Sequence, residues 1–370
     1  MLSFWESESF TKYDVAIIGA GITGLSVAIE LKAKQPELEV IILERGLVPT
    51  GASTKNAGFA CVGSLTEILD DLKTMSSNEV VDLIQMRKDG LQILRDRLGD
   101  QNIDYLENGS YELCLQETDF TSDIKLVNEL IFPVFKRPVF KLTNKVFGFG
   151  SEVKTVIEST AEGQINTGKM LKSLLKKALT LGVEVKTGYS VNNLITKQDS
   201  VRIENDILPI IAKQVCVCTN AFAKSLIPEI KLQPGRGQVL ITKPIKNLPF
   251  KGIYHFDEGY YYFRTIADRV LFGGGRQLDF EGETSDKFKL NEFIQKDLEK
   301  KMKTIILPGI KFEIDKRWTG IMAFGENKKP IIKQVDGRVF AAVRFGGMGI
   351  AIGSKAAELV ADLMISSRDL

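Results

Sequence analysis

Near the start of the chain the apolar positions follow two different periods. Residues 14–18 read Asp-Val-Ala-Ile-Ile, a β-branched run typical of a buried parallel strand. Apolar residues then recur at helical spacing from Leu25 to Leu31, and a second apolar run extends from Val40 to Leu43. This order predicts a strand, a helix and a second strand that belong to one parallel sheet.

The turn between the first strand and the helix is rich in glycine. Residues 19–24 read Gly-Ala-Gly-Ile-Thr-Gly, and Glu44 ends the second strand. Gly19 permits the tight turn, Gly21 lets the backbone approach a pyrophosphate, and Gly24 lets the helix pack closely on the strand. The helix N-terminus offers free N–H groups, and Glu44, about 20 residues beyond the third glycine, is placed to accept hydrogen bonds from ribose hydroxyls. A βαβ unit without a ligand is the alternative, but the ordered combination predicts a dinucleotide site, and the motif alone does not separate NAD from FAD.

A small, polar and glycine-rich segment follows this acidic residue. After Arg45, residues 50–59 read Thr-Gly-Ala-Ser-Thr-Lys-Asn-Ala-Gly-Phe. Such a backbone can lie against a ligand, and its hydroxyls can bind phosphate or ring atoms. By composition alone, an ordinary surface loop is an equally good interpretation.

In this segment the sequence resembles the D-amino acid oxidase superfamily of FAD-dependent oxidoreductases, in particular its branch of glycine, sarcosine and γ-glutamylputrescine oxidases. Residues 51–58 match the Gly-Ala-Ser-x-x-Asn-x-Gly stretch that contacts FAD in that family. The resemblance continues at residues 163–166, Gly-Gln-Ile-Asn, at residues 234–238, Pro-Gly-Arg-Gly-Gln, and at residues 345–350, Phe-Gly-Gly-Met-Gly-Ile. By this resemblance the last segment opens a helix that points at the flavin, where its dipole stabilises negative charge. A nicotinamide dehydrogenase does not need this second glycine-rich helix start, so FAD is favoured over NAD.

The resemblance also implies which residues bind FAD and that the FAD is noncovalent. No cysteine lies near Ile321, where the sarcosine oxidase branch attaches its flavin. The expected contacts are Gly19, Gly21, Ile22, Thr23 and Gly24; Glu44 and Arg45; Ala52, Ser53, Thr54, Asn56, Ala57 and Gly58; Val191, Thr219, Asn220 and Ala221; and Gly346, Gly347, Met348, Gly349 and Ile350.

The chain length and the positions of these matches predict an α/β protein in two interleaved parts. A chain of 370 residues favours two domains. We expect an FAD-binding Rossmann-like domain built from residues 1–80, 150–235 and 315–370. Residues 81–149 and 236–314 are expected to form an α+β substrate domain that contains a mixed or antiparallel sheet.

Two expected strands of the substrate domain carry candidate catalytic residues. Residues 259–264 read Gly-Tyr-Tyr-Tyr-Phe-Arg, and strand alternation sends Tyr260 and Tyr262 to one face and Tyr261 to the other. In the glycine oxidase pattern, Tyr261 falls at the active-site tyrosine and Arg276 falls beside the substrate, where it can bind an acidic group bidentately. Packing alone explains the tyrosine equally well, and a surface or interdomain position explains the arginine.

The chain departs from the family pattern at two positions near the expected substrate. Residues 318–323 read Trp-Thr-Gly-Ile-Met-Ala, which places Met322 where amino-acid-oxidising members have a carboxylate-binding arginine. Simple α-amino acids are therefore disfavoured as substrates. Phe272 lies near the position of the oxygen-activating lysine of the sarcosine oxidase branch, so both oxidase and dehydrogenase behaviour stay open.

Composition and charge mainly exclude other functions. The net charge of +2 gives no reason to expect a nucleic-acid partner. The one histidine, His255, excludes multi-histidine metal sites and is either an acid–base group or structural, and we expect no metal. The four cysteines form no Cys-x-x-Cys pair, and we interpret Cys216 and Cys218 as small buried hydrophobes.

Three further expectations concern partners and location. Four basic residues, Lys136, Arg137, Lys141 and Lys145, can attract an acidic partner, but a solvated loop or sheet face is the better interpretation. Residues 1–10 lack the basic region of a signal peptide, and no apolar stretch approaches the roughly 20 residues that span a bilayer. We expect a cytoplasmic protein whose oligomeric state the sequence leaves open.

The function expected from these features is FAD-dependent oxidation of the C–N bond of a small amine or N-substituted amino acid. Hydride moves to the flavin, and oxygen accepts the electrons to give hydrogen peroxide. The first alternative is an FAD-dependent dehydrogenase of a 2-hydroxy acid or polyol that passes electrons to a quinone or carrier. The second is a flavoprotein whose FAD is structural and which serves as a binding module.

Overall fold

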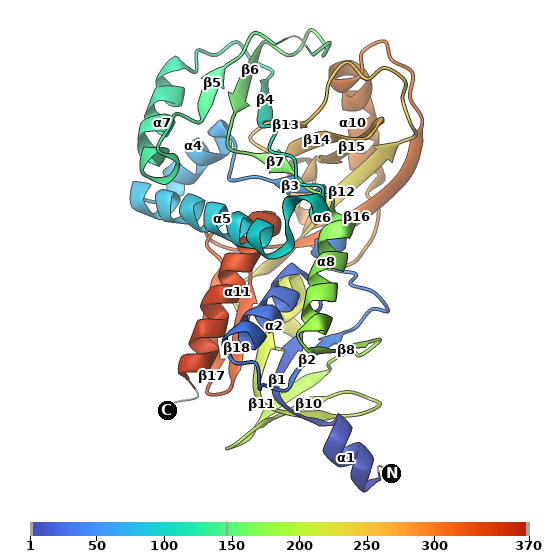
Figure 1. Cartoon of the computed structure of the whole chain (residues 1–370). Helices are drawn as coiled ribbons and strands as arrows, with labels where there is room; N and C mark the ends of the chain where they lie inside the picture. Colours follow the sequence, from blue (N-terminus) through green and yellow to red (C-terminus); the bar gives the residue numbers. More distant parts are fainter. Residues whose placement is uncertain (1–2, 146, 368–370) are drawn as a thin grey trace.

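The computed structural model describes residues 3–145 and 147–367 of the chain. Residues 1–2, 146 and 368–370, which belong to the expected domain segments, lie outside this description. Two eight-stranded sheets dominate the fold and occupy the lower and upper halves of Figure 1. A two-stranded sheet, β3 (Phe59–Ala60) with β7 (Gly163–Gln164), lies between them.

The first sheet is built around the predicted strand, helix and strand. Strand β1 (Lys12–Ile18) pairs in parallel with β2 (Val40–Glu44), and helix α2 (Ile22–Lys34) connects them, as predicted. The strand order is β17 (Ile331–Asp336), β18 (Val339–Val343), β11 (Ile210–Val217), β1, β2, β8 (Glu184–Thr187), with β10 (Val201–Glu204) and β9 (Asn193–Thr196) attached to β11. The five strands from β18 to β8 are parallel, so their carboxyl ends meet at one edge.

Helices α2, α8 (Thr167–Thr180) and α11 (Gly349–Ser366) cover one face of this sheet. Their apolar residues pack with alternate residues of the strands; examples are Ile17, Leu25, Leu174 and Val360, each less than 1% exposed. The opposite face packs with η1 (Asn220–Ser225) and with β9 and β10. A parallel sheet buried on both faces explains why its strands read as nearly continuous apolar runs.

The second sheet is mixed, as expected. Its order is β16 (Ile314–Phe324), β12 (Gln233–Thr242), β15 (Arg269–Gly274), β14 (Tyr261–Ile266), β13 (Ile253–Phe256), β4 (Ser110–Cys114), β6 (Thr155–Ser159), β5 (Phe140–Leu142). Only the β13–β4 pair is parallel among the pairs of this described sheet. Strands β6 and β16 pair within this sheet, although we placed residues 150–235 and 315–370 with the first; the domain division stays a prediction.

The two faces of the second sheet have different surroundings. An aromatic core that contains Tyr254, Phe256 and Phe272 packs against α10 (Glu292–Lys301) on one face. At one end of the other face lie α4 (Leu65–Thr74), α5 (Ser77–Leu98) and α7 (Thr121–Phe135). The remaining short helical segments are α1 (Phe4–Phe10), α3 (Ala52–Lys55), α6 (Asp100–Ile103), η2 (Arg276–Leu278), α9 (Phe280–Glu283) and η3 (Met302–Ile306).

None of the helices in the described residues is both long enough and apolar enough to cross a bilayer.

Candidate active site

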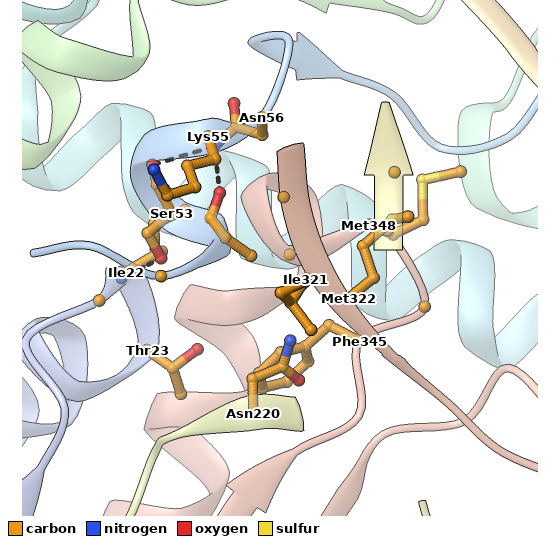
Figure 2. A pocket seen from close by; sticks show the side chains of 18 of the residues that line it. Ile22, Thr23, Ser53, Lys55, Asn56, Asn220, Ile321, Met322, Phe345 and Met348 are labelled. Atoms are coloured by element: carbon orange, nitrogen blue, oxygen red, sulfur yellow. Dashed lines mark hydrogen bonds between the residues drawn. The ribbon is translucent and has the colours of Figure 1, made fainter. Parts of the chain in front are cut away.

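A cavity of about 820 Å³ lies between the two sheets and is lined by residues from both. Its volume falls in the range of pockets that hold cofactors and small ligands. Figure 2 shows Ile22, Ser53 and Asn56 on one side and Met322 and Met348 on the other. Among the expected FAD contacts, the following line it: Gly19, Gly21, Ile22, Thr23, Glu44, Arg45, Ala52, Ser53, Asn56, Ala57, Val191, Thr219, Asn220, Gly346, Gly347, Met348, Gly349 and Ile350. Gly24, Thr54, Gly58 and Ala221 do not.

The glycine-rich turn has the packing that the sequence predicts. Gly19 has a φ of +102°, which favours glycine. A Cβ on Gly24 would lie 1.9 Å from the carbonyl oxygen of Gly19, so this glycine packs the helix on the turn and does not face the cavity. A Cβ on Gly21 would lie 2.8 Å from Ser53 Oγ, which accepts a hydrogen bond from the backbone N–H of Ile22 at 3.0 Å. The turn therefore closes around the short segment that follows β2.

Glu44 is fixed at the carboxyl end of β2, on the cavity wall. It is 6% exposed, and its two carboxylate oxygens each accept a backbone N–H at 3.0 Å, one from Ala20 and one from Gly46. These bonds hold the carboxylate in one orientation beside the turn. The neighbouring Arg45 stacks its guanidinium on the Phe222 ring, 3.9 Å from the ring centroid.

A buried arginine that the sequence analysis did not single out holds the segment after α3. Arg264 Nη1 donates to the carbonyl oxygens of Gly58 and Ile165, each at 2.8 Å, and of Ala57 at 3.2 Å. A Cβ on Gly58 would lie 2.4 Å from this nitrogen, so Gly58 contacts the arginine where we expected a ligand. Burial lowers the pKa of Arg264 to about 10. Thr54 is also turned away, because its hydroxyl donates to the Pro49 carbonyl at 2.9 Å.

The turn after β11 and the start of α11 complete the cofactor side of the cavity. The Thr219 hydroxyl is buried and has no hydrogen-bond partner among the described residues. Ala221 packs in the core behind this turn, which explains its absence from the cavity wall. Gly346 and Gly347 have φ of +53° and +88° and lead into α11, whose first residues have no side-chain cap.

The second sheet forms the other wall, and here one predicted residue is corrected. Tyr260 and Tyr262 line the cavity, whereas Tyr261 is 1% exposed in the aromatic core and donates its hydroxyl to Asp297 at 2.7 Å. The predicted alternation is therefore right, but the tyrosine chosen from the family pattern is on the wrong face. The Tyr262 ring lies across Gly273, where a Cβ would come within 2.7 Å of it. Burial raises the pKa of Tyr262 to about 12.

Arg276 and Met322 line the same wall, and their assignment to the substrate site stays a prediction. The Arg276 guanidinium carbon is 4.3 Å from the ring centroid of Phe324 and 5.0 Å from that of Phe280. Its Nε is buried without a hydrogen-bond partner, and the described residues give it no ion pair with a carboxylate. The cavity wall thus holds a cation whose donors are not used within the chain.

The basic cluster, the two neighbouring cysteines and the histidine lie in three different environments. In the basic cluster, Lys145 bonds Glu158 and Tyr111, each at 2.7 Å, so part of its charge is paired within the chain. The sulfur atoms of Cys216 and Cys218 lie 3.6 Å apart and are buried, as expected for small core residues. His255 lines the cavity together with Cys61.

A parallel sheet with a glycine turn, a fixed acid and a ligand-sized cavity defines a dinucleotide-binding protein. The chain matches the family described as FAD dependent oxidoreductase (DAO) over residues 14–363, and it belongs to that family. It is 22% identical over 364 residues to a probable oxidoreductase, OrdL, of Haemophilus influenzae, which covers 95% of this chain and 83% of that protein.

Two solved structures share the fold over nearly the whole chain. L-proline dehydrogenase from P. horikoshii has a TM-score of 0.77 at 18% identity and covers 96% of this chain and 94% of that one. Glycine oxidase from Geobacillus kaustophilus has a TM-score of 0.77 at 19% identity, with 96% and 95% covered. The protein is therefore an oxidoreductase of the DAO fold that depends on FAD.

The residues of the cavity fit this cofactor. Helices α2 and α11 both begin at the cavity without a side-chain cap from their N-cap residues. The Ile22 N–H of α2 is bound by Ser53 Oγ, and the N–H groups that follow in the first turns are placed to meet phosphate or ring oxygens. Thr219, whose buried hydroxyl has no hydrogen-bond partner among the described residues, lines the same space. A side chain on Gly21 would crowd Ser53 on the cavity wall, so glycine keeps the backbone of this turn open to the cavity.

Proposed function

We propose that this enzyme oxidises the C–N bond of a small amine or N-substituted amino acid, with FAD held noncovalently and oxygen as the electron acceptor. The observation that carries the proposal is the Arg276 guanidinium on the cavity wall, which has no carboxylate partner among the described residues; Tyr262 lines the same cavity. A guanidinium with free donors suits a carboxylate, and the pair can hold an amino acid by its acid group. The names of glycine oxidase and L-proline dehydrogenase both refer to amino acids, which supports this substrate class.

FAD supplies the two-electron chemistry when it is bound, and the chain supplies position and electrostatics. Glu44 and the open ends of α2 and α11 would hold the cofactor. Tyr262 keeps its proton at neutral pH, because its pKa is about 12, and so can donate a hydrogen bond to a substrate carboxylate. Met322 offers no charge, so Arg276 is the cation we assign to substrate binding on this wall.

A second candidate differs in substrate and acceptor. The apolar Met322 at the family's arginine position, and the likeness to a dehydrogenase, favour an FAD-dependent dehydrogenase of a 2-hydroxy acid or polyol that passes electrons to a quinone or carrier. A flavoprotein that binds FAD without reacting is the remaining possibility. Location in the cytoplasm stays a prediction.

An anaerobic screen separates these functions. Purified enzyme is mixed with glycine, N-methylglycine, L-proline, D-alanine, putrescine, lactate and glycerol, and flavin absorbance is followed. We expect the amines or amino acids to bleach the flavin and air to restore its colour with formation of hydrogen peroxide. Bleaching by lactate or glycerol alone supports the dehydrogenase, and bleaching by none supports a binding module.

Acid precipitation of the same enzyme tests the mode of FAD attachment. Cys61 lines the cavity although it is far in sequence from Ile321, so the cavity does contain a thiol. We expect all the flavin to stay in the supernatant as FAD. Yellow colour in the washed precipitate would contradict noncovalent binding.

A further inference from the structure

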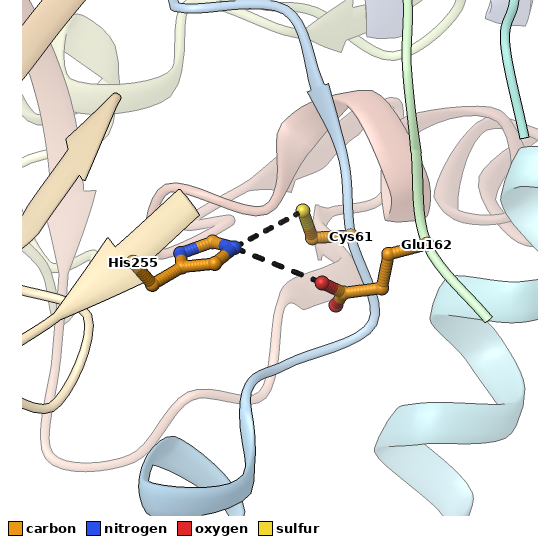
Figure 3. Close-up of side chains that lie close together, drawn as sticks. All are labelled: Cys61, Glu162 and His255. Carbon is orange, nitrogen blue, oxygen red and sulfur yellow. Dashed lines mark hydrogen bonds and ion pairs between the residues drawn. The ribbon is translucent and has the colours of Figure 1, made fainter. Parts of the chain in front are cut away.

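A buried polar cluster adjoins the cavity wall next to Tyr262. Its central residues are Cys61, Glu162 and His255, which come from three separate segments and converge as Figure 3 shows. Cys61 and His255 line the cavity, and Glu162 is 0% exposed behind them. In the sheet register His255 on β13 is directly opposite Tyr262 on β14, so both side chains project from the same face.

Glu162 is an anion that the fold holds in place. One carboxylate oxygen accepts the backbone N–H groups of Val62 and Gly63 at 2.8 and 2.9 Å, and the other accepts the hydroxyl of Ser110. Burial raises the pKa of Glu162, but the interaction with His255 and the bonds from Ser110 and Gly63 outweigh it and hold this pKa at about 2. The carboxylate is therefore charged at neutral pH.

The imidazole makes two long contacts, both through the same nitrogen. His255 Nε2 is 3.7 Å from Glu162 Oε2 and 3.8 Å from Cys61 Sγ. At 3.7 Å the carboxylate attracts the charged ring but takes up no N–H, because hydrogen bonds between nitrogen and oxygen are shorter. Both partners face the same nitrogen, and burial raises the pKa of the Cys61 thiol well above its usual value. The cluster is therefore not a thiol–imidazole nucleophile.

The groups around the ring set its protonation. Burial lowers the pKa of His255, whereas Glu162, then Glu67 on α4 and Glu112 on β4, raise it, and the net pKa lies above its ordinary value. Arg87 on α5, which donates to the Val62 carbonyl at 2.7 Å, is the cation packed against the cluster. The imidazole is the acid–base group of this cluster, and the surrounding carboxylates favour its charged form.

We propose that His255 accepts the proton that a substrate ammonium must lose before its C–N bond is oxidised, and that Glu162 is the residue that positions the imidazole. This inference rests on the proposed function, since amines are largely protonated at neutral pH and a hydride leaves only from the carbon beside a neutral nitrogen. One N–H bond of the ammonium breaks, its electron pair stays on the substrate nitrogen, and the proton bonds to the imidazole. The step consumes no oxidant.

The other ionisable groups on the cavity wall are less suited to this step. Tyr262, with a pKa of about 12, cannot accept a proton at neutral pH. Glu67 is bound by the backbone N–H of Ser64 at the start of α4, and Glu258 is exposed to solvent. Asp70 pairs with Lys73 at 3.2 Å. Glu44 is as buried as His255, but its two oxygens already accept backbone N–H groups. Glu162 holds the charge of His255.

Nuclear magnetic resonance tests the positioning directly, because the chain has one histidine and its imidazole signal needs no assignment. The signal is titrated in the substrate-free holoenzyme, in Glu162→Gln and in the control Glu158→Gln, which changes a carboxylate that bonds Lys145 in the same sheet. We expect Glu162→Gln to lower the imidazole pKa and the control to leave it unchanged. An unchanged pKa in Glu162→Gln overturns the positioning role. If the imidazole signal does not titrate and the protein contains one metal ion per chain, the whole proposal is overturned.

Rapid-mixing kinetics test the proton transfer. The rate of flavin reduction at low substrate concentration is measured across pH in the wild type and in His255→Gln, with whichever of glycine, N-methylglycine or L-proline reduces the wild type fastest. We expect the wild-type rate to rise through the imidazole pKa found by resonance, and His255→Gln to lose this rise together with roughly 10²-fold in rate at the optimum. An unchanged pH profile in His255→Gln overturns the proposal. If this variant does not fold, the proposal is overturned when the wild-type kinetic pKa differs from the imidazole pKa found by resonance. Absence of reduction by any amine in the wild type contradicts the proposed function instead.

Discussion

Replacement of Arg264 by methionine is the sharpest test of how the cavity is built. This arginine joins the second sheet to the segment that lines the cofactor side, through three hydrogen bonds from one nitrogen to the Ala57, Gly58 and Ile165 carbonyls. The Arg264 side chain is 6% exposed, and its hydrogen bonds go to backbone carbonyls. The carbonyl dipoles therefore stabilise its positive charge. Methionine keeps most of the apolar volume but removes every donor.

The expected loss of stability follows from the hydrogen bonds that Arg264→Met removes. A hydrogen bond from a charged donor contributes about 1.5–3 kcal/mol, and a buried acceptor left without a partner costs a similar amount. Three bonds to neighbouring carbonyls are not additive, so we expect Arg264→Met to lower the free energy of unfolding by about 3–5 kcal/mol. That is a large part of the 5–15 kcal/mol that is usual for a folded protein.

Arg264→Met is expected to weaken cofactor binding as well, because Ala57 lines the cavity and its carbonyl is bound by this arginine. We expect FAD affinity to fall at least about tenfold, which corresponds to ~1.4 kcal/mol. Urea unfolding of the FAD-free protein and fluorescence titration with FAD measure the two effects.

The matched control is Arg269→Met, which removes a partly exposed ion pair with Asp315 and one hydrogen bond to the Thr242 carbonyl. A surface pair of this kind contributes about 0.2–1 kcal/mol, and this variant should bind FAD normally. Equal free energies of unfolding in the two variants, or equal FAD affinities, would refute the role assigned to Arg264.

Three further changes test other parts of the account. Gly21→Ala should weaken FAD binding by fluorescence titration because its Cβ meets the loop serine at 2.8 Å, whereas Gly337→Ala, which has open space, should not. Tyr262→Phe should raise the substrate KM roughly tenfold with little change in thermal stability. Tyr261→Phe should leave KM unchanged and lower the free energy of unfolding by about 1 kcal/mol. A KM effect confined to Tyr261→Phe would restore the family-pattern assignment. The Glu162 pKa of about 2 lies below its unfolded value, so the stabilisation by this carboxylate is present above the unfolded pKa and is lost as pH falls towards 2. Acid unfolding of Glu162→Gln should lack this component, and an identical acid profile in the wild type would contradict the assignment.

The parts of the fold set by local sequence could be predicted. The turn at residues 19–24 needs glycines for reasons that involve neighbouring residues alone, and Gly24 packs on Gly19 as the motif implies. The alternation of the tyrosines on β14 is likewise a local property and is confirmed. The choice of Tyr261 over Tyr262 was wrong, because a pattern match shifted by one residue selects the opposite face of a strand.

The residues that the sequence analysis missed act through partners far along the chain. Arg264 meets the carbonyls of residues more than 90 positions away, and Glu162 meets His255 at a similar separation along the chain. The periodicity of apolar and polar residues within one helix or strand does not predict such contacts. The one sequence feature that pointed to Arg264 was its position in an otherwise aromatic and apolar strand. A charged side chain is buried there only if hydrogen-bond or ion-pair partners surround it.

The central claim is that this cavity binds an amine through Arg276 and oxidises it with FAD. The most direct measurement is the flavin spectrum during anaerobic titration with N-methylglycine, glycine and L-proline, in the wild type and in Arg276→Gln. The account predicts bleaching of the wild-type flavin by at least one of them, and a half-saturating concentration at least about tenfold higher in the variant. Flavin that no amine bleaches, or equal half-saturation in both proteins, would contradict it.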